Sequence, residues 1–285
     1  MRFVSFEVQG QASYGVWQDE HTWWQVPADF AARHPDLKSV IAANALRELA
    51  AAAQQAQRVV RADEARLLPV IPQPGKVFCV GLNYKSHVAE MKRPDSAYPA
   101  IFTRFADSLS AHAAPLPKPA VTQRFDYEGE LAIIVGRGGR GIAEADAWAH
   151  IAGYACFNDG TARDWQRHTH QWTPGKNFPA TGPLGPFMAT PDAVGDLAQL
   201  TLETRLNGQV VQHASVGDLI YTVPVIMAYL SQFTELAPGD VIATGTPGGV
   251  GDKREPPLYM HAGDVIEVEI THLGTLRNVV VDATV

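Results

Sequence analysis

The chain has 285 residues, 46% of them hydrophobic, and a formal net charge of −7. This length allows one large domain, or a small domain and a large one, around a true hydrophobic core. An acidic chain without a basic stripe argues against a nucleic acid partner. The two cysteines, Cys79 and Cys156, lie in apolar runs without the spacing of a zinc site, so we expect buried free thiols in a reducing cytoplasm.

The N-terminal residues do not resemble a signal peptide, because acidic and polar side chains occur before any long apolar stretch. The longest apolar run, residues 219–230, contains Thr222 and Pro224 and is too short to cross a bilayer. We therefore predict a cytoplasmic protein that does not associate with membranes.

The first 70 residues differ in character from the rest. Residues 3–8 and 13–17 alternate between apolar and polar side chains, which predicts two strands. Residues 39–60 place apolar side chains on one face at helical spacing, which predicts one amphipathic helix. A proline-rich linker follows. We predict a small N-terminal α/β domain over residues 1–70 and a catalytic domain over residues 71–285.

The catalytic region consists of short apolar segments separated by glycine and proline. Asn207-Gly208 between two such segments is a strong hairpin signal. The pattern predicts a β-rich α+β fold rather than a doubly wound sheet. Strands are expected at residues 76–80, 130–135, 151–157, 200–206, 209–211, 241–244, 265–270 and 276–281, and helices at residues 145–150 and 223–233.

Acidic residues gather at the ends of two predicted strands. Glu128 and Glu130 lie two residues apart, so on a strand their side chains share a face about 7 Å apart. Carboxylates this close repel each other unless a cation lies between them. Asp159 follows the 151–157 strand and would join them if the two strands are neighbours. Three oxygen ligands without histidine or cysteine favour Mg²⁺ or Mn²⁺; a solvated acidic turn is the alternative.

His87 and Glu90 are three residues apart, shortly after the first strand of the catalytic region. If the chain from Tyr84 onward is helical, the two share a face, and Glu90 can hold one imidazole nitrogen. The other nitrogen would then act as a general base toward water. A surface pair is the alternative interpretation.

Residues 158–166 combine a carboxylate, a guanidinium and an amide. Arg163 could bind a substrate carboxylate, and Gln166 could donate to a developing oxyanion; a surface turn explains the same pattern. Lys176 could supply positive charge to an enolate or simply be solvated. Residues 244–251 are glycine-rich but lack the ending of a Walker A motif. Their backbone amides could bind a carboxylate, or the segment could be a plain turn.

Together these segments resemble the fumarylacetoacetate hydrolase family over residues 72–285. The resemblance depends on the order and spacing of short motifs at residues 81–84, 127–131, 158–166, 175–178 and 244–247, together with His87 and Glu90. It implies a mixed β-roll catalytic fold, usually dimeric, that holds Mg²⁺ or Mn²⁺. Family substrates are 2-oxo or 2,4-diketo acids, so a homodimer acting on such a small molecule is expected.

The resemblance also implies roles for single residues. Glu128, Glu130 and Asp159 would bind the metal, which would act as Lewis acid and template for the substrate. His87, oriented by Glu90, would activate water, and Lys176 and Gln166 would stabilise the charge that develops. The residues implied in substrate binding are Tyr84, Arg104, Arg163 and Thr246.

The chain departs from the family pattern at a residue that would contact the far end of the substrate. Arg104 stands where many relatives have a lysine, although an arginine can still bind a carboxylate. His112 and Trp172 are further candidates for this end of the pocket. The polar segment 80–100, which carries His87, is expected to act as a lid.

Two enzymatic hypotheses follow. The first is metal-dependent hydrolysis of a C–C bond in an acylpyruvate-type 2,4-diketo acid. The second is decarboxylation or tautomerisation of oxaloacetate, or isomerisation of an unsaturated 2-oxo diacid from aromatic catabolism, because these reactions pass through the same kind of enolate. A non-catalytic scaffold would have lost one of the motif residues, and none is missing.

Overall fold

The computed structural model describes residues 1–91 and 96–283. The strands are β1 (Arg2–Val8), β2 (Gln11–Trp17), β3 (Thr22–Gln25), β4 (Val59–Arg61), β5 (Ala65–Leu67), β6 (Val77–Gly81), β7 (Ala100–Arg104), β8 (Leu109–Ser110), β9 (Leu116–Lys118), β10 (Phe125–Asp126), β11 (Gly129–Val135), β12 (Ile151–Asn158), β13 (Thr161–Ala162), β14 (Gly182–Ala189), β15 (Thr201–Leu206), β16 (Gln209–Ser215), β17 (Val241–Ala243), β18 (Val265–Ile270) and β19 (Gly274–Asp282).

The α-helices are α1 (Ala28–Arg33), α2 (Leu37–Ala42), α3 (Leu46–Ala56), α4 (Lys85–Met91), α5 (Arg163–Gln166), α6 (Thr173–Lys176), α7 (Pro191–Val194) and α8 (Val223–Phe233). Short 3₁₀ helices are η1 (Ala106–Ser108), η2 (Glu144–His150), η3 (Leu197–Gln199), η4 (Val216–Asp218) and η5 (Gly251–Lys253). Within the described ranges, no helix combines the length and the apolar character that crossing a membrane requires.

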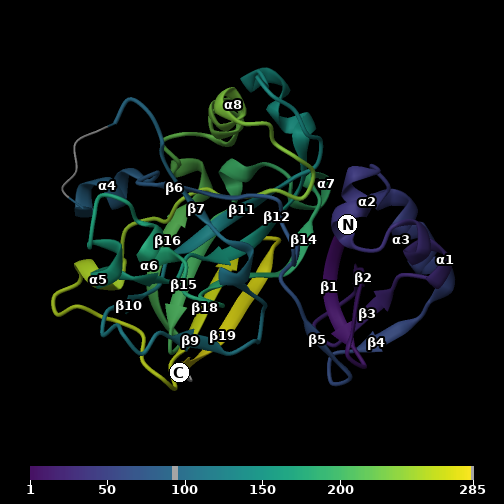
Figure 1. The fold of residues 1–285 in the computed structure, drawn as a ribbon, viewed down its shortest axis with the longest axis horizontal. Helices are drawn as coiled ribbons and strands as arrows, with labels where there is room; N and C mark the ends of the chain where they lie inside the picture. The colour runs from purple at the N-terminus through teal and green to yellow at the C-terminus, as the bar shows by residue number, and fades with distance from the viewer. Residues whose placement is uncertain (92–95, 284–285) are drawn as a thin grey trace.

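The strands form a β-rich mixed fold around one large sheet. Its order is β4-β3-β2-β1-β14-β12-β11-β17-β6-β7, with β5 paired to β1 and β8 to β14. Strand β11 is antiparallel to both of its neighbours, β12 and β17. A second sheet, in the order β16-β15-β18-β19-β9, shares a hydrophobic core with the large sheet (Figure 1). The predicted β-rich α+β class is confirmed.

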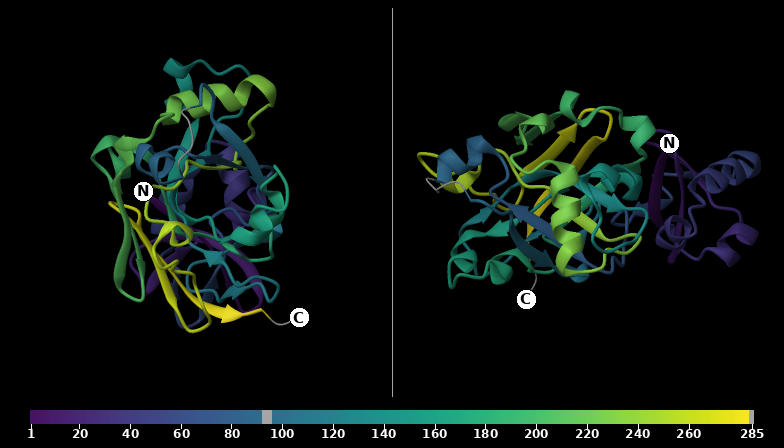
Figure 2. Two further views of the ribbon diagram at one scale, coloured as in Figure 1. Left: turned by 90° about the vertical axis from the view of Figure 1, so that its left-hand side faces the viewer. Right: turned by 90° about the horizontal axis from the view of Figure 1, so that it is seen from above.

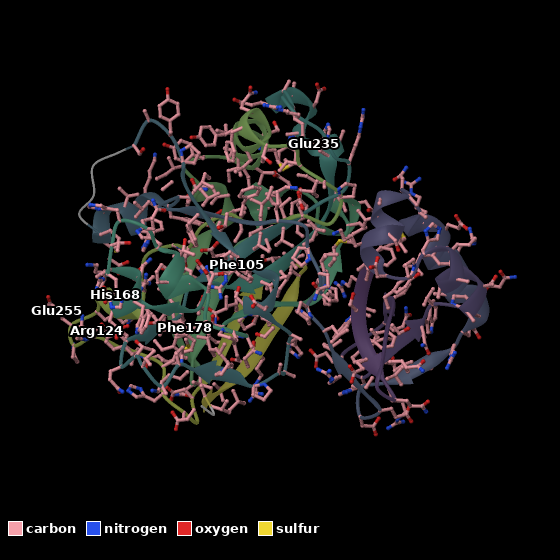
Figure 3. The ribbon with its side chains drawn as sticks, in the orientation of Figure 1. Phe105, Arg124, His168, Phe178, Glu235 and Glu255 are labelled. Atoms are coloured by element: carbon pink, nitrogen blue, oxygen red, sulfur yellow. The ribbon has the colours of Figure 1, made fainter. Side chains whose placement is uncertain are left out.

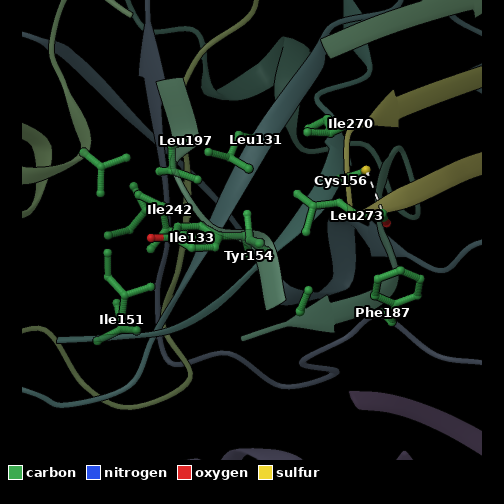
Figure 4. Close-up of a cluster of buried hydrophobic side chains, with 14 of the residues drawn as sticks. Leu131, Ile133, Ile151, Tyr154, Cys156, Phe187, Leu197, Ile242, Ile270 and Leu273 are labelled. Atoms are coloured by element: carbon green, nitrogen blue, oxygen red, sulfur yellow. Dashed lines mark hydrogen bonds between the residues drawn. The ribbon is translucent and has the colours of Figure 1, made fainter. Parts of the chain in front are cut away.

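Strand β11 is buried on both faces, as its unbroken apolar sequence predicts. Leu131 and Ile133 belong to the core shared with α8 and the second sheet, whereas Ala132 and Ile134 belong to a core that includes the N-terminal helices. Figure 4 shows the first core, where Tyr154 of β12 lies opposite Ile133. A strand held on both faces and by both neighbours is a rigid support for functional groups at its end.

The first 70 residues are joined to the large sheet. Strand β1 pairs with β2 on one side and, through Phe3 opposite Met188, with β14 on the other. In Figures 1 and 2 this N-terminal part lies at one end of the molecule, and α4 lies at the opposite end. The division into domains at residue 70 stays a prediction.

The single helix predicted over residues 39–60 is instead two helices, α2 and α3. Asn44 lies between them with φ 54°, a left-handed conformation that asparagine tolerates and that interrupts a helix. Asp36 caps α2 by accepting a hydrogen bond from the Ser39 amide. The spacing of apolar residues identified the buried face correctly. It did not reveal the break, because one residue with an unusual backbone angle leaves that spacing almost unchanged.

The strands predicted between residues 76 and 281 are present. Asn207 and Gly208 form the predicted hairpin turn between β15 and β16, with φ 52° and 78°. Helix α8 has the predicted bounds, and the short helix predicted at residues 145–150 is the 3₁₀ helix η2.

One buried side chain connects the segments that converge on the site. Asn83, between β6 and α4, is fully buried. Its Nδ2 donates to the carbonyl oxygens of Thr244 at 2.7 Å and Tyr221 at 3.0 Å, and its Oδ1 accepts from the Tyr221 amide at 2.7 Å. Asn83 therefore holds the start of the glycine-rich segment and the approach to α8 against the chain that leads into α4.

We expect the Asn83→Ala substitution to lower the free energy of unfolding by about 2–4 kcal/mol, because it leaves buried backbone groups without partners. Urea denaturation followed by circular dichroism measures this change. The matched control is Gln54→Ala on the exposed side of α3, which we expect to change stability by less than about 0.5 kcal/mol. Equal effects of the two substitutions would contradict the bridging role of Asn83.

Candidate active site

Three carboxylates meet where β11 begins and β12 ends. Gly129 lies opposite Asn158 in this strand pair. Glu128 and Glu130 are the neighbours of Gly129 in the chain, and Asp159 directly follows Asn158. One oxygen from each of the three side chains lies within 4.8 Å of the other two, and all three residues are buried. The two strands are neighbours, and the three carboxylates lie together as expected in that case.

Buried cations surround two of these acids. Lys176 Nζ, at the end of α6, donates to Glu128 and to Asp159. Arg163 Nη2 donates to Glu128 at 2.6 Å, and Arg104 Nη1 donates to Asp159 at 2.5 Å. Burial alone would raise the pKa of Glu128, but the charges of Arg163 and Lys176 hold it well below its usual range.

Glu130 differs from the other two because no cationic side chain among the described residues forms an ion pair with it. Its side chain accepts a hydrogen bond from the Gly245 amide at 2.8 Å. Burial, together with the charges of Asp159 and Glu128, raises the pKa of Glu130 well above its usual range. A cluster that needs more positive charge and offers only carboxylate oxygens fits a hard divalent cation, Mg²⁺ or Mn²⁺.

The acids lie on a cavity of about 390 Å³. This volume is near the small end of the range for ligand sites, so a small substrate is indicated. The cavity is lined by all three acids. Further candidates from the sequence line it too, namely His87, Arg163, Gln166, Lys176, Thr246 and Trp172.

The His87–Glu90 pair lies on α4, as the spacing predicts. His87 is only 5% exposed and lines the cavity, and its Nδ1 is 3.4 Å from Glu90 Oε2. Glu90 also accepts from the Gly249 amide, with distances of 3.1 and 3.2 Å to its two oxygens. The carboxylate is thereby fixed beside the imidazole, which is the arrangement that orients a histidine base.

Helix α5 presents an amide to the cavity in a defined orientation. Arg163 Nε donates to Asp126 at 2.8 Å, and its Nη1 donates to Gln166 Oε1 at 3.1 Å. Because Oε1 of Gln166 is the acceptor, its Nε2 remains as the donor. Gln166 is thus suited to donate to a negative oxygen in the cavity.

The backbone amides of the glycine-rich segment bind carboxylates, but these are side chains of the protein itself. Besides Gly245 and Gly249, which donate to the two glutamates described above, the Gly251 amide donates to Asp126 at 2.8 Å. Gly249 has φ 101°, and a Cβ there would lie 2.2 Å from the Val211 carbonyl oxygen, so glycine is required. Thr246 Oγ donates to the Gly129 carbonyl at 3.0 Å and accepts from Gln212 at 2.8 Å.

Three expected substrate contacts lie elsewhere. Arg104 does not line the cavity, because its guanidinium is used behind Asp159, donating also to Ser108 and Thr181. Tyr84 is fully buried outside the cavity lining, and its hydroxyl has no hydrogen-bond partner among the described residues. His112 lines a second cavity, beside the N-terminal strands. Arg104 therefore orients the Asp159 carboxylate from behind and does not line the cavity.

Several lining residues were not identified from the sequence. They are Arg167, Thr169 and His170, which follow α5, and the apolar side chains of Leu82, Met91 and Phe102. Arg167 could have been found, because it lies four residues after Arg163 and so shares its face of the helical turn. Of the predicted lid segment 80–100, residues 92–95 lie outside the described residues.

The chain is similar to known proteins of one family. A family model described as the C-terminal domain of fumarylacetoacetate (FAA) hydrolase matches residues 76–281. The chain is 41% identical over 225 residues to human oxaloacetate tautomerase FAHD2A, mitochondrial, covering 78% of this chain and 72% of that protein. It is 38% identical over 240 residues to the Xenopus laevis oxaloacetate tautomerase fahd2, mitochondrial, covering 84% and 75%.

Solved structures give the same result. A fumarylacetoacetate hydrolase from Exiguobacterium antarcticum superimposes with a TM-score of 0.86 and 36% identity, covering 99% of this chain and 100% of that one. A maleylpyruvate hydrolase from Sphingobium sp. SYK-6, solved with manganese(II) and pyruvate, gives a TM-score of 0.82 and 27% identity with full coverage of both chains. Sequence and fold agree over the whole catalytic region, and the chain belongs to the fumarylacetoacetate hydrolase family of enzymes.

Proposed function

We propose that the protein interconverts the keto and enol forms of a short 2-oxo acid, with oxaloacetate as the first candidate substrate. The observation that carries the proposal is that a histidine base, His87, lines the same small cavity as the three carboxylates. The relatives from human and Xenopus laevis named oxaloacetate tautomerase support this choice of substrate.

Glu128, Glu130 and Asp159 would hold Mg²⁺ or Mn²⁺. The bound cation would supply electrophilic stabilisation of negative charge on the 2-oxo group. His87 would accept a proton from the carbon beside that group and return it to oxygen, and Glu90 would stabilise the imidazolium formed between these steps. Gln166 Nε2 would donate to the enolate oxygen.

Hydrolysis of an acylpyruvate-type 2,4-diketo acid is the second candidate. The His87–Glu90 pair favours it, because C–C hydrolysis needs a base that activates water. His87 would take a proton from water as the water oxygen attacks the distal carbonyl. The C–C bond would then break to release an acid and the enolate of pyruvate, with Lys176 and Gln166 near the developing charge. Decarboxylation of oxaloacetate and isomerisation of an unsaturated 2-oxo diacid would each pass through an enolate of the same kind, stabilised by the same groups.

The protein, supplied with Mg²⁺, is expected to accelerate the decay of the enol absorbance of oxaloacetate over that of a protein-free solution of the same Mg²⁺ concentration. EDTA should abolish the acceleration. Acetylpyruvate is tested in parallel, with products identified. Release of pyruvate and acetate without an effect on oxaloacetate would favour hydrolysis over tautomerisation, and inactivity on both would contradict both candidates.

Replacing the proposed base should remove most of the activity. We expect His87→Ala to lower kcat by about 10²-fold or more while Mg²⁺ binding stays unchanged, because the imidazole is not among the carboxylate ligands. His213→Ala, an exposed histidine on β16, is the matched control. Full activity of His87→Ala would remove the imidazole from the mechanism.

The metal site can be tested without turnover. Glu130→Gln keeps the size of the side chain but removes a charged ligand, so we expect Mn²⁺ affinity to fall at least about tenfold. Isothermal titration calorimetry or the electron paramagnetic resonance signal of free Mn²⁺ measures this change. Glu235→Gln, on the surface (Figure 3), should bind Mn²⁺ like the unaltered protein. Equal affinities of the two variants would exclude Glu130 as a ligand.

The cytoplasmic location, the homodimer and the closing lid stay predictions from sequence. The names of the curated relatives place those proteins in mitochondria.

A further inference from the structure

The outer wall of the active-site cavity carries a second arginine. Arg167 follows the last residue of α5 and lies one helical turn after Arg163, so both face the same cavity. Figure 3 labels the next residue, His168, and Arg124 on the side of the molecule where α5 lies in Figure 1. Residues 167–170 are exposed, so the chain that leaves α5 runs along the surface and Arg167 belongs to the outer part of the site.

The two arginines differ in how many of their N–H donors remain available to a ligand. Arg163 is 2% exposed, and each of its three nitrogens donates to a protein acceptor, namely Asp126, Gln166 or Glu128. The side chain of Arg167 is 42% exposed, and its hydrogen bonds within the described chain go from its two terminal nitrogens to Asp252. A guanidinium has five N–H donors, so Arg167 keeps its Nε–H and further terminal hydrogens for a ligand.

Asp252 holds Arg167 in place without cancelling the positive charge of this region. Its carboxylate accepts from Arg167 Nη1 at 3.1 Å and from the Tyr259 hydroxyl at 3.0 Å. Lys253 Nζ lies 3.8 Å from the same carboxylate, so two cations share one acid. The Asp252 amide donates to Asp126 at 3.0 Å, and this bond ties the arrangement to the buried part of the site.

Part of the cavity wall is apolar and offers no donor to an anion. Leu82, Met91 and Phe102 contribute apolar surface to the same cavity of about 390 Å³. A carboxylate that enters this cavity loses water, and such a loss is costly unless a charged donor replaces the water. Arg167, with His170 beside it in the cavity lining, offers that donor.

We propose that Arg167 binds the second carboxylate of the substrate, so that the site selects short 2-oxo dicarboxylates over 2-oxo acids with an uncharged end. The proposal rests on the proposed function for the position of the 2-oxo acid group, which the carboxylate cluster and its cation would hold. Arg167 is a specificity-determining residue in this scheme and takes no part in the proton transfer.

The test compares two ligands that differ only at the far end. Oxaloacetate has a carboxylate where 2-oxobutyrate has a methyl group, and their dissociation constants are measured by calorimetry on the Mg²⁺-loaded protein. We expect the unaltered protein to prefer oxaloacetate at least about tenfold, and Arg167→Gln to abolish this preference by weakening oxaloacetate binding alone. In turnover, the same variant should raise KM for oxaloacetate and leave kcat nearly unchanged.

An unchanged affinity of Arg167→Gln for 2-oxobutyrate would show that the rest of the site remains intact. Arg140→Gln, an exposed arginine outside the cavity lining, is the matched control and should retain the preference. A variant at Arg167 that still prefers oxaloacetate, or that weakens both ligands equally, overturns the proposal. A protein that binds oxaloacetate with this preference but does not accelerate its tautomerisation overturns the proposed function instead and leaves the role of Arg167 standing.

Discussion

The site depends on buried negative charge that the protein neutralises only in part. Four buried carboxylates, those of Asp126, Glu128, Glu130 and Asp159, are accompanied by three buried cations that pair with all of them except Glu130. Burying a carboxylate without a cation is costly. The rigid pairing of β11 with β12 nevertheless keeps the acids together, so the fold maintains a cluster of carboxylate oxygens that could hold a further cation.

The glycine-rich segment gives this cluster its internal order. Its amides donate to Glu130, to Glu90 beside the proposed base, and to Asp126 behind Arg163. One stretch of backbone thus sets the positions of a proposed metal ligand, the partner of the base and the support of α5. Small shifts of this segment would move all three groups together. A side chain at Gly249 would force such a shift, because its Cβ would lie 2.2 Å from the Val211 carbonyl oxygen.

The parts of the site that follow from local spacing could be predicted. Glu128 and Glu130 share a face because a strand has a period of two, and His87 and Glu90 do so because a helix brings residues three apart together. Long-range contacts could not be predicted in this way. Arg104 reaches Asp159 across 55 residues, and only the folded chain shows that its guanidinium faces that acid instead of the cavity. The break at Asn44 was missed for a similar reason, since the identity of one residue did not reveal its backbone angle.

The pairing of β1 with β14 has a consequence for the first 70 residues. Strand β14 has β12 on one side and β1 on the other, so a chain trimmed to the family-model region, residues 76–281, would leave the end of β14 at Met188 and Ala189 without its β1 partner. Uncovered sheet edges of this kind recruit strands from other molecules and lead to aggregation. Strand β1 of the N-terminal part thus covers backbone groups of β14 that would otherwise be open to pairing with another molecule.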